Sequence, residues 1–294
     1  MRRLVITMVA VAMVVSGCAA GPLNVATRPI DFVEVGVDDT GTPTISAPSD
    51  LEVTSARSRT EWRGEGEILA FGDIAVLHLF AVSIATGEVV RSTWNPPEGE
   101  PALPQTVRFT PDDVGADLFA ALNGKRAGAR VVHLAPAQEG REELGPVAIV
   151  IDIVNPRASG PVEASPADMP IVEESDRGIP TITLRDVEAP DVLQVHTVIR
   201  GQGSQIRAGS WALLEYVAVD YSTGAVWQTS WNESTPPWEV QLGVGATIPG
   251  LDIGLLDQSE GSRVLLVVPP EDAYGETALV FVVDVIAVWN GEAA

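Results

Sequence analysis

Three stretches in the second half of the chain are rich in Val, Leu and Ile and are bounded by Gly, Pro or Asp turn signals. Such runs predict β-strands that are buried in a sheet. We therefore expect strands over Ala212–Val219, Ser262–Val268 and Leu279–Val288. A turn at Ser222–Gly224 predicts a hairpin that pairs residues 211–220 with residues 225–230.

Apolar residues recur at helical spacing in two short segments. After Pro249, three leucines fall on one face, and Gly261 follows as a stop signal. The segment Pro111–Leu122 shows a related pattern and predicts a second helix, which ends at Asn123–Gly124. Several strands with one helix in each half indicate a sheet wrapped on a helix, which is an α+β architecture.

The two halves of the chain repeat each other, which accounts for the paired helices. The offset between matching segments is 137 positions at first, then 133, and finally 132. This period is far too long for a solenoid unit, so it indicates a duplicated domain. The matching pairs are Gly41–Ile45 with Gly178–Ile182, Arg63–Gly66 with Arg200–Gly203, Trp94–Asn95 with Trp231–Asn232, Gly128–Val131 with Gly261–Val264, and Ile151–Asp152 with Val283–Asp284.

The segments between and before the copies are rich in Pro, Ala and Ser, which predicts extended linkers. We therefore expect a first domain over residues 41–154, a linker over 155–176, and a second domain over 177–294. Residues 18–40 are predicted to form a tether ahead of the first domain.

The first seventeen residues have the pattern of a secretory signal. Arg2 and Arg3 precede an apolar run, Leu4–Val15, that is shorter than the roughly 20 residues of a membrane-spanning helix. The run leads into Val15-Ser16-Gly17-Cys18, which resembles the bacterial lipobox and contains the sole cysteine. The resemblance implies cleavage after residue 17, a lipid on Cys18 and an extracytoplasmic protein anchored to the cell membrane. The alternative is an ordinary cleavage site after Gly17 without a lipid.

Acidic residues dominate the charge. The chain has a net charge of -22, and loss of Arg2 and Arg3 with the signal makes it about -24. Such a surface repels nucleic-acid phosphates, so we exclude nucleic-acid binding. It also repels anionic lipid headgroups, so the predicted acyl chain must supply membrane contact. A single cysteine excludes a disulfide within the chain, so stability must come from packing.

The second copy carries an ordered set of motifs. Trp238–Gly243 resembles the pattern F-x-F-x-L-G, and Gly261–Gly275 resembles G-x-x-x-x-x-I-P-P-x-x-A-Y-G. Together with the remaining segments, this copy resembles the FK506-binding-protein (FKBP) type of peptidyl-prolyl cis-trans isomerase. The further matching segments are Leu214–Tyr216, Thr223–Ser230, Thr247–Leu251 and Leu279–Asp284. The resemblance implies a mainly antiparallel β, α+β fold, with two FKBP-like copies in tandem.

The resemblance also implies where the site lies. Rotation about an X-Pro bond must overcome a barrier of ~18–20 kcal/mol, and an apolar bowl that binds the proline ring favours the twisted amide. By family analogy the Ile248 backbone N–H binds the substrate and Tyr274 donates its hydroxyl. The bowl implied by the resemblance consists of Tyr216, Trp227, Trp238, Ile248, Leu251, Tyr274 and Phe281.

The second copy departs from the family pattern at three places. Gln228 replaces the family's acidic residue, and Leu251 replaces the tryptophan at the floor of the bowl. The segment between Gly275 and the last strand is also shorter than the family's usual flap. These differences leave open whether the bowl catalyses isomerisation or only binds peptides.

The first copy lacks the aromatic residues of the bowl. We expect a folded but catalytically silent, degenerate FKBP-like domain with a role in spacing, chaperoning or docking. The residues that stand at the matching positions are Leu79, Val90, Gln105, Gly115 and Leu118.

We expect neither a cofactor nor a metal, because His78, His133 and His196 have no Cys or His at ligand spacing. Our first hypothesis is an exported, lipid-anchored FKBP-type isomerase that acts on proline-containing polypeptides and assists the folding of secreted proteins. The alternatives are a non-catalytic FKBP-like chaperone or peptide-binding surface lipoprotein, and a structural envelope lipoprotein without a peptide site.

Overall fold

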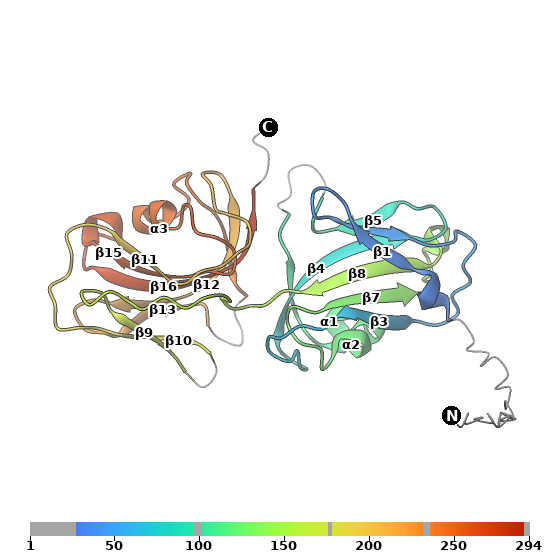
Figure 1. Cartoon of the computed structure of the whole chain (residues 1–294), viewed down its shortest axis with the longest axis horizontal. Coiled ribbons are helices and arrows are strands. Elements are labelled where there is room, and N and C mark those ends of the chain that lie inside the picture. The colour runs from blue at the N-terminus through green and yellow to red at the C-terminus, as the bar shows by residue number, and fades with distance from the viewer. Residues whose placement is uncertain (1–27, 97–101, 176–177, 232–235, 291–294) are drawn as a thin grey trace, which may run out of the picture.

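The computed structural model describes residues 28–96, 102–175, 178–231 and 236–290. The predicted signal peptide and Cys18 therefore lie outside the described residues. Two domains of the same topology lie end to end and are joined by a single connecting segment (Figure 1). Within the described residues, no helix is long and apolar enough to cross a membrane.

The first domain is built on a six-stranded antiparallel sheet with the strand order β3-β7-β8-β4-β5, in which β6 also pairs with β4. A separate hairpin, β1-β2, precedes it. The bounds of the strands are Glu34–Val37 (β1), Pro43–Ser46 (β2), Arg57–Trp62 (β3), Ile74–Ser83 (β4), Val89–Ser92 (β5), Gln105–Arg108 (β6), Arg130–Ala135 (β7) and Val147–Ile153 (β8). The helical segments are η1 (Pro29–Phe32), α1 (Pro111–Val114), α2 (Ala116–Leu122) and η2 (Glu142–Leu144).

The second domain repeats this topology, with the order β11-β15-β16-β12-β13 and β14 paired with β12. Its strands are Ile171–Glu174 (β9), Pro180–Thr183 (β10), Gln194–Ile199 (β11), Trp211–Asp220 (β12), Val226–Thr229 (β13), Trp238–Gln241 (β14), Arg263–Val268 (β15) and Leu279–Trp289 (β16). Its helical segments are α3 (Pro249–Gly254) and η3 (Pro270–Asp272). The predicted fold class, mainly antiparallel β with short helices in two tandem copies, is confirmed.

The predicted strands and the hairpin of the second domain are confirmed. The three predicted strands are β12, β15 and β16, and β12 pairs with β13 across the predicted turn. Helix α3 lies against β15 because two of its residues are glycines. A Cβ on Gly250 would lie 2.3 Å from Val268 Cγ1, and one on Gly254 would lie 2.5 Å from Leu266 Cδ2. The glycines therefore allow the close approach that seats the helix on the sheet.

The prediction of one continuous helix over Pro111–Leu122 is wrong. The chain forms two shorter helices, α1 and α2, because Gly115 between them has φ +87° and ψ 144°. Only glycine adopts this conformation readily, and it interrupts the helical hydrogen bonds. The aligned residue in the second domain is Ile248, which has ordinary extended dihedrals and precedes α3.

Both faces of each sheet are covered. In the second domain one face packs against α3 and the residue that follows it, through Leu251 and Leu255, and the other face packs against the β9-β10 hairpin, through Val172 and Ile182. Helix α3 ends at Gly254, so the prediction that Gly261 ends this helix is wrong. The first domain repeats this arrangement, with η1 and the β1-β2 hairpin on its far face. The structure thus places β1 within the predicted tether and β9 within the predicted linker, so each hairpin belongs to its domain. The domain boundaries as a whole stay a prediction.

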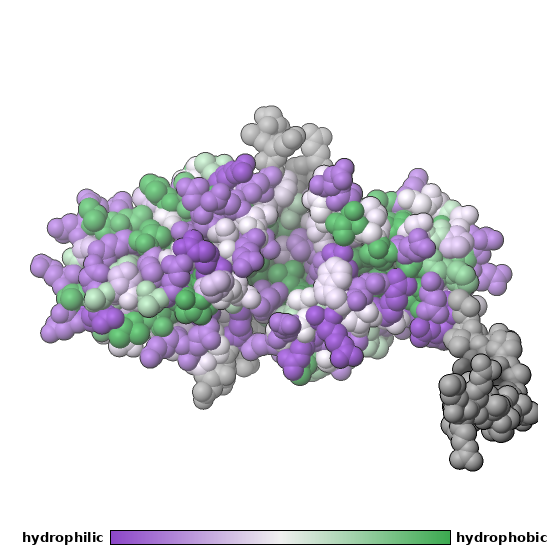
Figure 2. Space-filling model, in the orientation of Figure 1, coloured by the Kyte–Doolittle hydropathy of each residue, from purple (hydrophilic) through white to green (hydrophobic). Residues whose placement is uncertain are grey.

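The two domains share an apolar contact. Val76 of the first domain packs with Leu213 and Ile286 of the second, and Trp211 and Trp289 border this cluster. Hydrophilic residues cover most of the viewed surface of both domains, and apolar residues come to the surface between them (Figure 2). The two sheets are therefore held together by buried side chains as well as by the connecting segment.

Candidate functional site

A pocket of about 770 Å³ opens on the second domain beside α3. Strands β12, β13, β14 and β16 contribute to it, together with the loop before α3 and the segment after η3. All seven residues predicted from the sequence line this one pocket: Tyr216, Trp227, Trp238, Ile248, Leu251, Tyr274 and Phe281. Their catalytic role stays a prediction, but the structure brings them together around an unfilled hollow.

Aromatic rings form the walls of this pocket. The ring of Tyr216 meets that of Trp238 edge-on, with centroids 5.6 Å apart, and lies 6.3 Å from the ring of Phe281. Trp227 and Tyr274 form a second pair, with centroids 5.0 Å apart. The two sets of rings differ in exposure: Trp227 and Tyr274 are 45% and 60% exposed, whereas Phe281 is buried. The pocket thus has a solvated rim and an interior wall that belongs to the core.

The floor of the pocket is continuous with the hydrophobic core. Leu251 and Phe281 are 3% and 2% exposed and belong to the same buried cluster. Tyr216, Trp238 and Ile248 pack against that cluster while keeping part of their surface free. An apolar ring of ligand size would therefore meet aliphatic and aromatic carbon on several sides.

Polar groups also border the pocket, and one of them is a backbone donor. The backbone N–H of Ile248 donates no hydrogen bond to any described residue, because Ile248 precedes the first turn of α3 and its own carbonyl is the group used by the helix. Nearby, the carboxylate of Asp252 accepts the N–H groups of Gly243 and Gly245, at 2.9 and 3.0 Å. Asp252 therefore fixes the loop that presents Ile248.

The two tyrosines can act as hydrogen-bond donors. Neither the Tyr216 hydroxyl nor the Tyr274 hydroxyl makes a hydrogen bond within the part of the chain that the structure describes. Burial raises the pKa of the Tyr216 phenol, and the nearby Tyr274 and Glu215 raise it further. The phenol of Tyr216 therefore keeps its proton at neutral pH.

Sequence reasoning missed part of the lining. The pocket is also bordered by Ser230, Pro236 and Pro237, and by Thr229, Glu239, Ala246 and Thr247. Gln228, noted as a departure from the family pattern, lines it as well. The two prolines directly precede Trp238, and this Pro-Pro-Trp sequence is a signal that could have pointed to them.

The matching region of the first domain carries different side chains. Register places Gln105 opposite Leu77, as Trp238 lies opposite Leu214, so the predicted replacement of an aromatic wall by a polar residue holds in space. The repeat aligns Phe119 on α2 with Asp252, and the Phe119 ring stacks on that of Phe109 at 4.7 Å. An aromatic stack therefore stands where the second domain has a carboxylate that orders a loop.

Among the described residues, no group of three His, Cys, Asp or Glu side chains is arranged to hold a metal ion.

Comparison with known proteins gives matches to FKBP-type isomerases. Residues 203–284 match the family model described as FKBP-type peptidyl-prolyl cis-trans isomerase. The chain is 33% identical over 120 residues to an FK506-binding protein of Streptomyces anulatus, which covers 37% of this chain and 96% of that protein. It is 32% identical over 117 residues to a probable FK506-binding protein of Corynebacterium glutamicum, with 37% and 97% covered.

Solved structures give weaker likenesses. The three FKBP domains of wheat FKBP73 match with a TM-score of 0.31 and 14% identity, covering 80% of this chain and 94% of that one. AtFKBP13 matches with a TM-score of 0.30 and 23% identity, covering 40% of this chain and 97% of that one.

Proposed function

Since the chain belongs to the FKBP-type peptidyl-prolyl cis-trans isomerase family, we propose that its second domain catalyses the isomerisation of X-Pro bonds at the pocket beside α3. The observation that carries this proposal is the convergence of seven predicted residues on an unfilled hollow of about 770 Å³. Had their side chains filled that space, no proline ring could enter.

The chemistry asked of the pocket is modest. The proline ring enters between the Tyr216–Trp238 wall and Phe281, above Leu251. The N–H of Ile248, which donates to no described residue, then binds a substrate carbonyl and holds the peptide in place. Twisting the X-Pro bond breaks amide resonance and makes its carbonyl less polar, so an apolar site stabilises the twisted state relative to water. No nucleophile or metal takes part in this scheme.

We assign no catalysis to the first domain. Its aligned positions carry Leu79, Val90 and Gln105 in place of aromatic residues, and Gly115 in place of Ile248. It serves in this proposal as a folded spacer between the anchor and the active domain.

The location of the protein is also part of the proposal. The apolar run before Val15-Ser16-Gly17-Cys18 supports export, lipidation of Cys18 and anchoring outside the cytoplasmic membrane, where the clients are proline-containing secreted polypeptides. Palmitate labelling in a bacterial host tests this. We expect label in the parent chain and none in Cys18→Ser, and an unlabelled parent chain would remove the lipid anchor from the proposal.

Isomerase activity is tested with a protease-coupled assay on Xaa-Pro peptides, using the purified chain. We expect turnover above the uncatalysed rate, and loss of it in the double variant Trp227→Ala/Trp238→Ala. The matched control is Val90→Ala in the first domain, at the position aligned with Trp227, which should leave turnover unchanged. A parent chain without turnover contradicts catalysis.

A second candidate function is peptide binding without turnover. It is favoured by Gln228 and Leu251, and by the 60% exposure of Tyr274, which leaves one side of the pocket open. Titration of tryptophan fluorescence with a proline peptide discriminates between the two. Saturable quenching that disappears in Trp227→Ala/Trp238→Ala, together with an absence of turnover in the parent, selects binding alone.

A further inference from the structure

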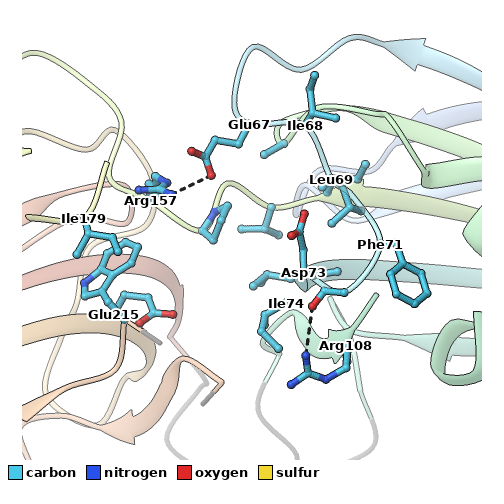
Figure 3. A pocket seen from close by; sticks show the side chains of 18 residues that line it. Glu67, Ile68, Leu69, Phe71, Asp73, Ile74, Arg108, Arg157, Ile179 and Glu215 are labelled. Carbon is cyan, nitrogen blue, oxygen red and sulfur yellow. Dashed lines mark hydrogen bonds and ion pairs between the residues drawn. The ribbon is translucent and has the colours of Figure 1, made fainter. Parts of the chain in front are cut away.

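A second cavity, of about 620 Å³, lies at the junction of the two domains (Figure 3). We call it the junction cleft. The first domain lines it with Ile68, Phe71 and Asp73, the second domain with Glu215 and Trp231, and the connecting segment with Arg157. Ligand pockets are frequent at domain interfaces, and this volume lies within their usual range.

Arg157 is the cation of the connecting segment that enters this cleft. Its Nη2 donates to Glu67 Oε2 at 2.9 Å, and the two side chains point toward each other in Figure 3. The guanidinium also lies 5.3 Å from the centre of the Trp231 ring. Its Nε and Nη1 are buried and have no hydrogen-bond partner among the described residues. A group with five N–H donors is therefore met by one carboxylate.

That carboxylate can be displaced. The Glu67 side chain is 58% exposed, whereas the Arg157 side chain is 19% exposed. An ion pair with one solvated partner is weak, so Glu67 can turn to water at little cost. The Arg157 side chain cannot turn to water in the same way, because the Trp231 ring and Gly178 enclose it. A carboxylate from a ligand, paired in the two-pronged geometry that arginine favours, would replace Glu67.

The cleft has an apolar wall beside this cation. Ile68 and Phe71 are 52% and 69% exposed, and Ile74 and Ile179 complete the wall. Large apolar side chains left in water at a concave surface mark a binding site. In Figure 3 the side chains of Ile68 and Ile74 lie across the cleft from Ile179 and Glu215. A ligand for this cleft therefore combines an apolar group with a single negative charge.

We propose that the junction cleft is a second binding site, distinct from the aromatic pocket, that takes a polypeptide C-terminus whose free carboxylate pairs with Arg157 and whose last apolar side chain packs on Ile68 and Phe71. Multiply charged anions such as phosphate are disfavoured, because three acidic residues, Glu67, Asp73 and Glu215, line the cleft against two cations, Arg157 and Arg108, and Arg108 already donates to the carbonyl of Gly72.

Glu215 makes this site sensitive to pH. It pairs with Asp284 across strands β12 and β16, receives a hydrogen bond from Ser230 at the end of β13, and shares the cleft with Arg157. Asp284 is itself held by Arg263 on β15. Burial, with the Asp284 charge, raises the pKa of Glu215 to about 7. Above that pH an ionised Glu215 competes for Arg157, so ligand binding weakens.

The experiment is a calorimetric titration of the full chain at pH 6 with acetyl-Ala-Leu, which has a free carboxylate and no proline. The paired probe is the same peptide with a C-terminal amide. We expect saturable binding of the acid, at least tenfold weaker binding of the amide, and weaker binding of the acid at pH 8. Equal affinity for the two peptides, or no binding of the acid, overturns the proposal.

Two variants of the cleft shift binding in opposite directions. Arg157→Gln should lose the acid peptide, whereas Glu67→Gln should bind it several-fold more tightly, because the competing carboxylate is gone. A purely structural role of the ion pair predicts weaker binding in both, so that result would overturn the proposal. The matched control is Arg200→Gln, which removes an exposed ion pair with Glu163 outside the cleft and should change nothing.

The aromatic pocket is separated by a further variant. Trp227→Ala/Trp238→Ala should leave binding of acetyl-Ala-Leu intact, because neither ring lines the junction cleft. Loss of binding in this variant, with retention in Arg157→Gln, would place the peptide in the aromatic pocket and overturn the proposal. None of these results depends on isomerase turnover, so the proposed function and this inference fail separately.

Discussion

The two domains share one topology but differ at the few positions that decide whether a pocket forms. In the second domain Ile248 directly precedes α3, Asp252 of α3 fixes the loop before the helix, and Trp238 lies on β14 and lines the same pocket as Ile248. In the first, Gly115 breaks the helix and Phe119 stacks on Phe109. The same sheet, register and covering elements therefore accommodate either set of side chains. The fold alone therefore does not imply a site.

A second difference lies on the other face of each sheet. Cross-strand pairing aligns Glu215, Asp284 and Arg263 in the second domain, and His78, Asp152 and Arg130 in the first. The residue opposite the aspartate on the neighbouring strand is therefore an acid, Glu215, in the second domain and a base, His78, in the first. Burial acts on them in opposite senses, since it raises the pKa of Glu215 to about 7 and lowers the pKa of His78 to about 4.

The largest effect is expected from breaking the buried ion pairs. Arg263 and Asp284 are 2% and 0% exposed and form two hydrogen bonds, of 2.6 and 2.8 Å. Asp284→Asn leaves the buried Arg263 with only the half-exposed carboxylate of Glu174 as a charged partner and should lower the free energy of unfolding by about 3–5 kcal/mol. Asp152→Asn should cost roughly 1–2 kcal/mol, because Asp152 is 25% exposed and water screens the pair. Urea unfolding measures both, and equal losses would contradict the distinction.

The next largest effect is the pH dependence of stability that Glu215 causes in the second domain. The folded chain keeps the Glu215 proton up to a pKa of about 7, whereas the unfolded chain releases it near 4.5. Stability therefore falls as the pH rises from 4.5 to 7, by up to roughly 3 kcal/mol, and Glu215→Gln should remove this fall.

His78 should show the opposite sign. Burial, with the Arg130 charge, lowers its pKa to about 4, so only the unfolded chain takes up a proton between pH 6.5 and 4. Stability is lost as the pH falls through that window, and His78→Gln should abolish the loss. Calorimetric melting from pH 4 to 8 tests both variants. Melting curves that stay parallel to those of the parent would refute the assignment.

A smaller effect is expected at the aligned pair Gly115 and Ile248. Gly115→Ala should destabilise the first domain by about 2 kcal/mol, since its φ of +87° suits only glycine. A Cβ there meets no atom within 4 Å, so the cost is purely that of the backbone. The comparison variant Ile248→Val keeps ordinary extended dihedrals and should cost below about 1 kcal/mol. Thermal melting that shows no loss in Gly115→Ala would contradict this reading.

The smallest effect concerns one hydroxyl at the rim of the pocket. Tyr274→Phe removes a single donor to the substrate, which is worth about 1 kcal/mol, so kcat/KM should fall several-fold without vanishing. Tyr221→Phe is the matched control, because the Tyr221 hydroxyl donates to Val187 O at 3.4 Å, away from the pocket. Complete loss in Tyr274→Phe, or an equal fall in the control, would show that this hydroxyl has another role.

Local sequence predicted the long elements well. Strands β12, β15 and β16 carry continuous apolar runs because both faces of their sheet are covered, and such runs are readable without coordinates. The hairpins β1-β2 and β9-β10 have four-residue strands with few apolar residues, so their sequences resemble linkers. They form because Val35 and Val172 find a sheet face to pack on.

The residues of the candidate site also divide into those that the sequence could predict and those that it could not. Its aromatic residues could be named in advance, because each stands in a motif that a family resemblance makes visible. The contribution of Ser230 could not be named in advance, since Ser230 borders the pocket only because β12 pairs with β13. The row of Glu215, Asp284 and Arg263 was equally hidden, because a cross-strand register joins residues far apart in the chain.

The chain by itself determined the duplication, the long strands and the acidic charge, since these follow from self-comparison, composition and local periodicity, and its family resemblance indicated the aromatic residues of one pocket. Tertiary structure decided that the pocket is open, that Gly115 splits a helix in one copy, and that Arg157 meets Glu67 in a cleft between the domains. These outcomes depend on packing and burial between distant segments. Such interactions have no local signature, because their energies arise only when the sheets and the connecting segment come together.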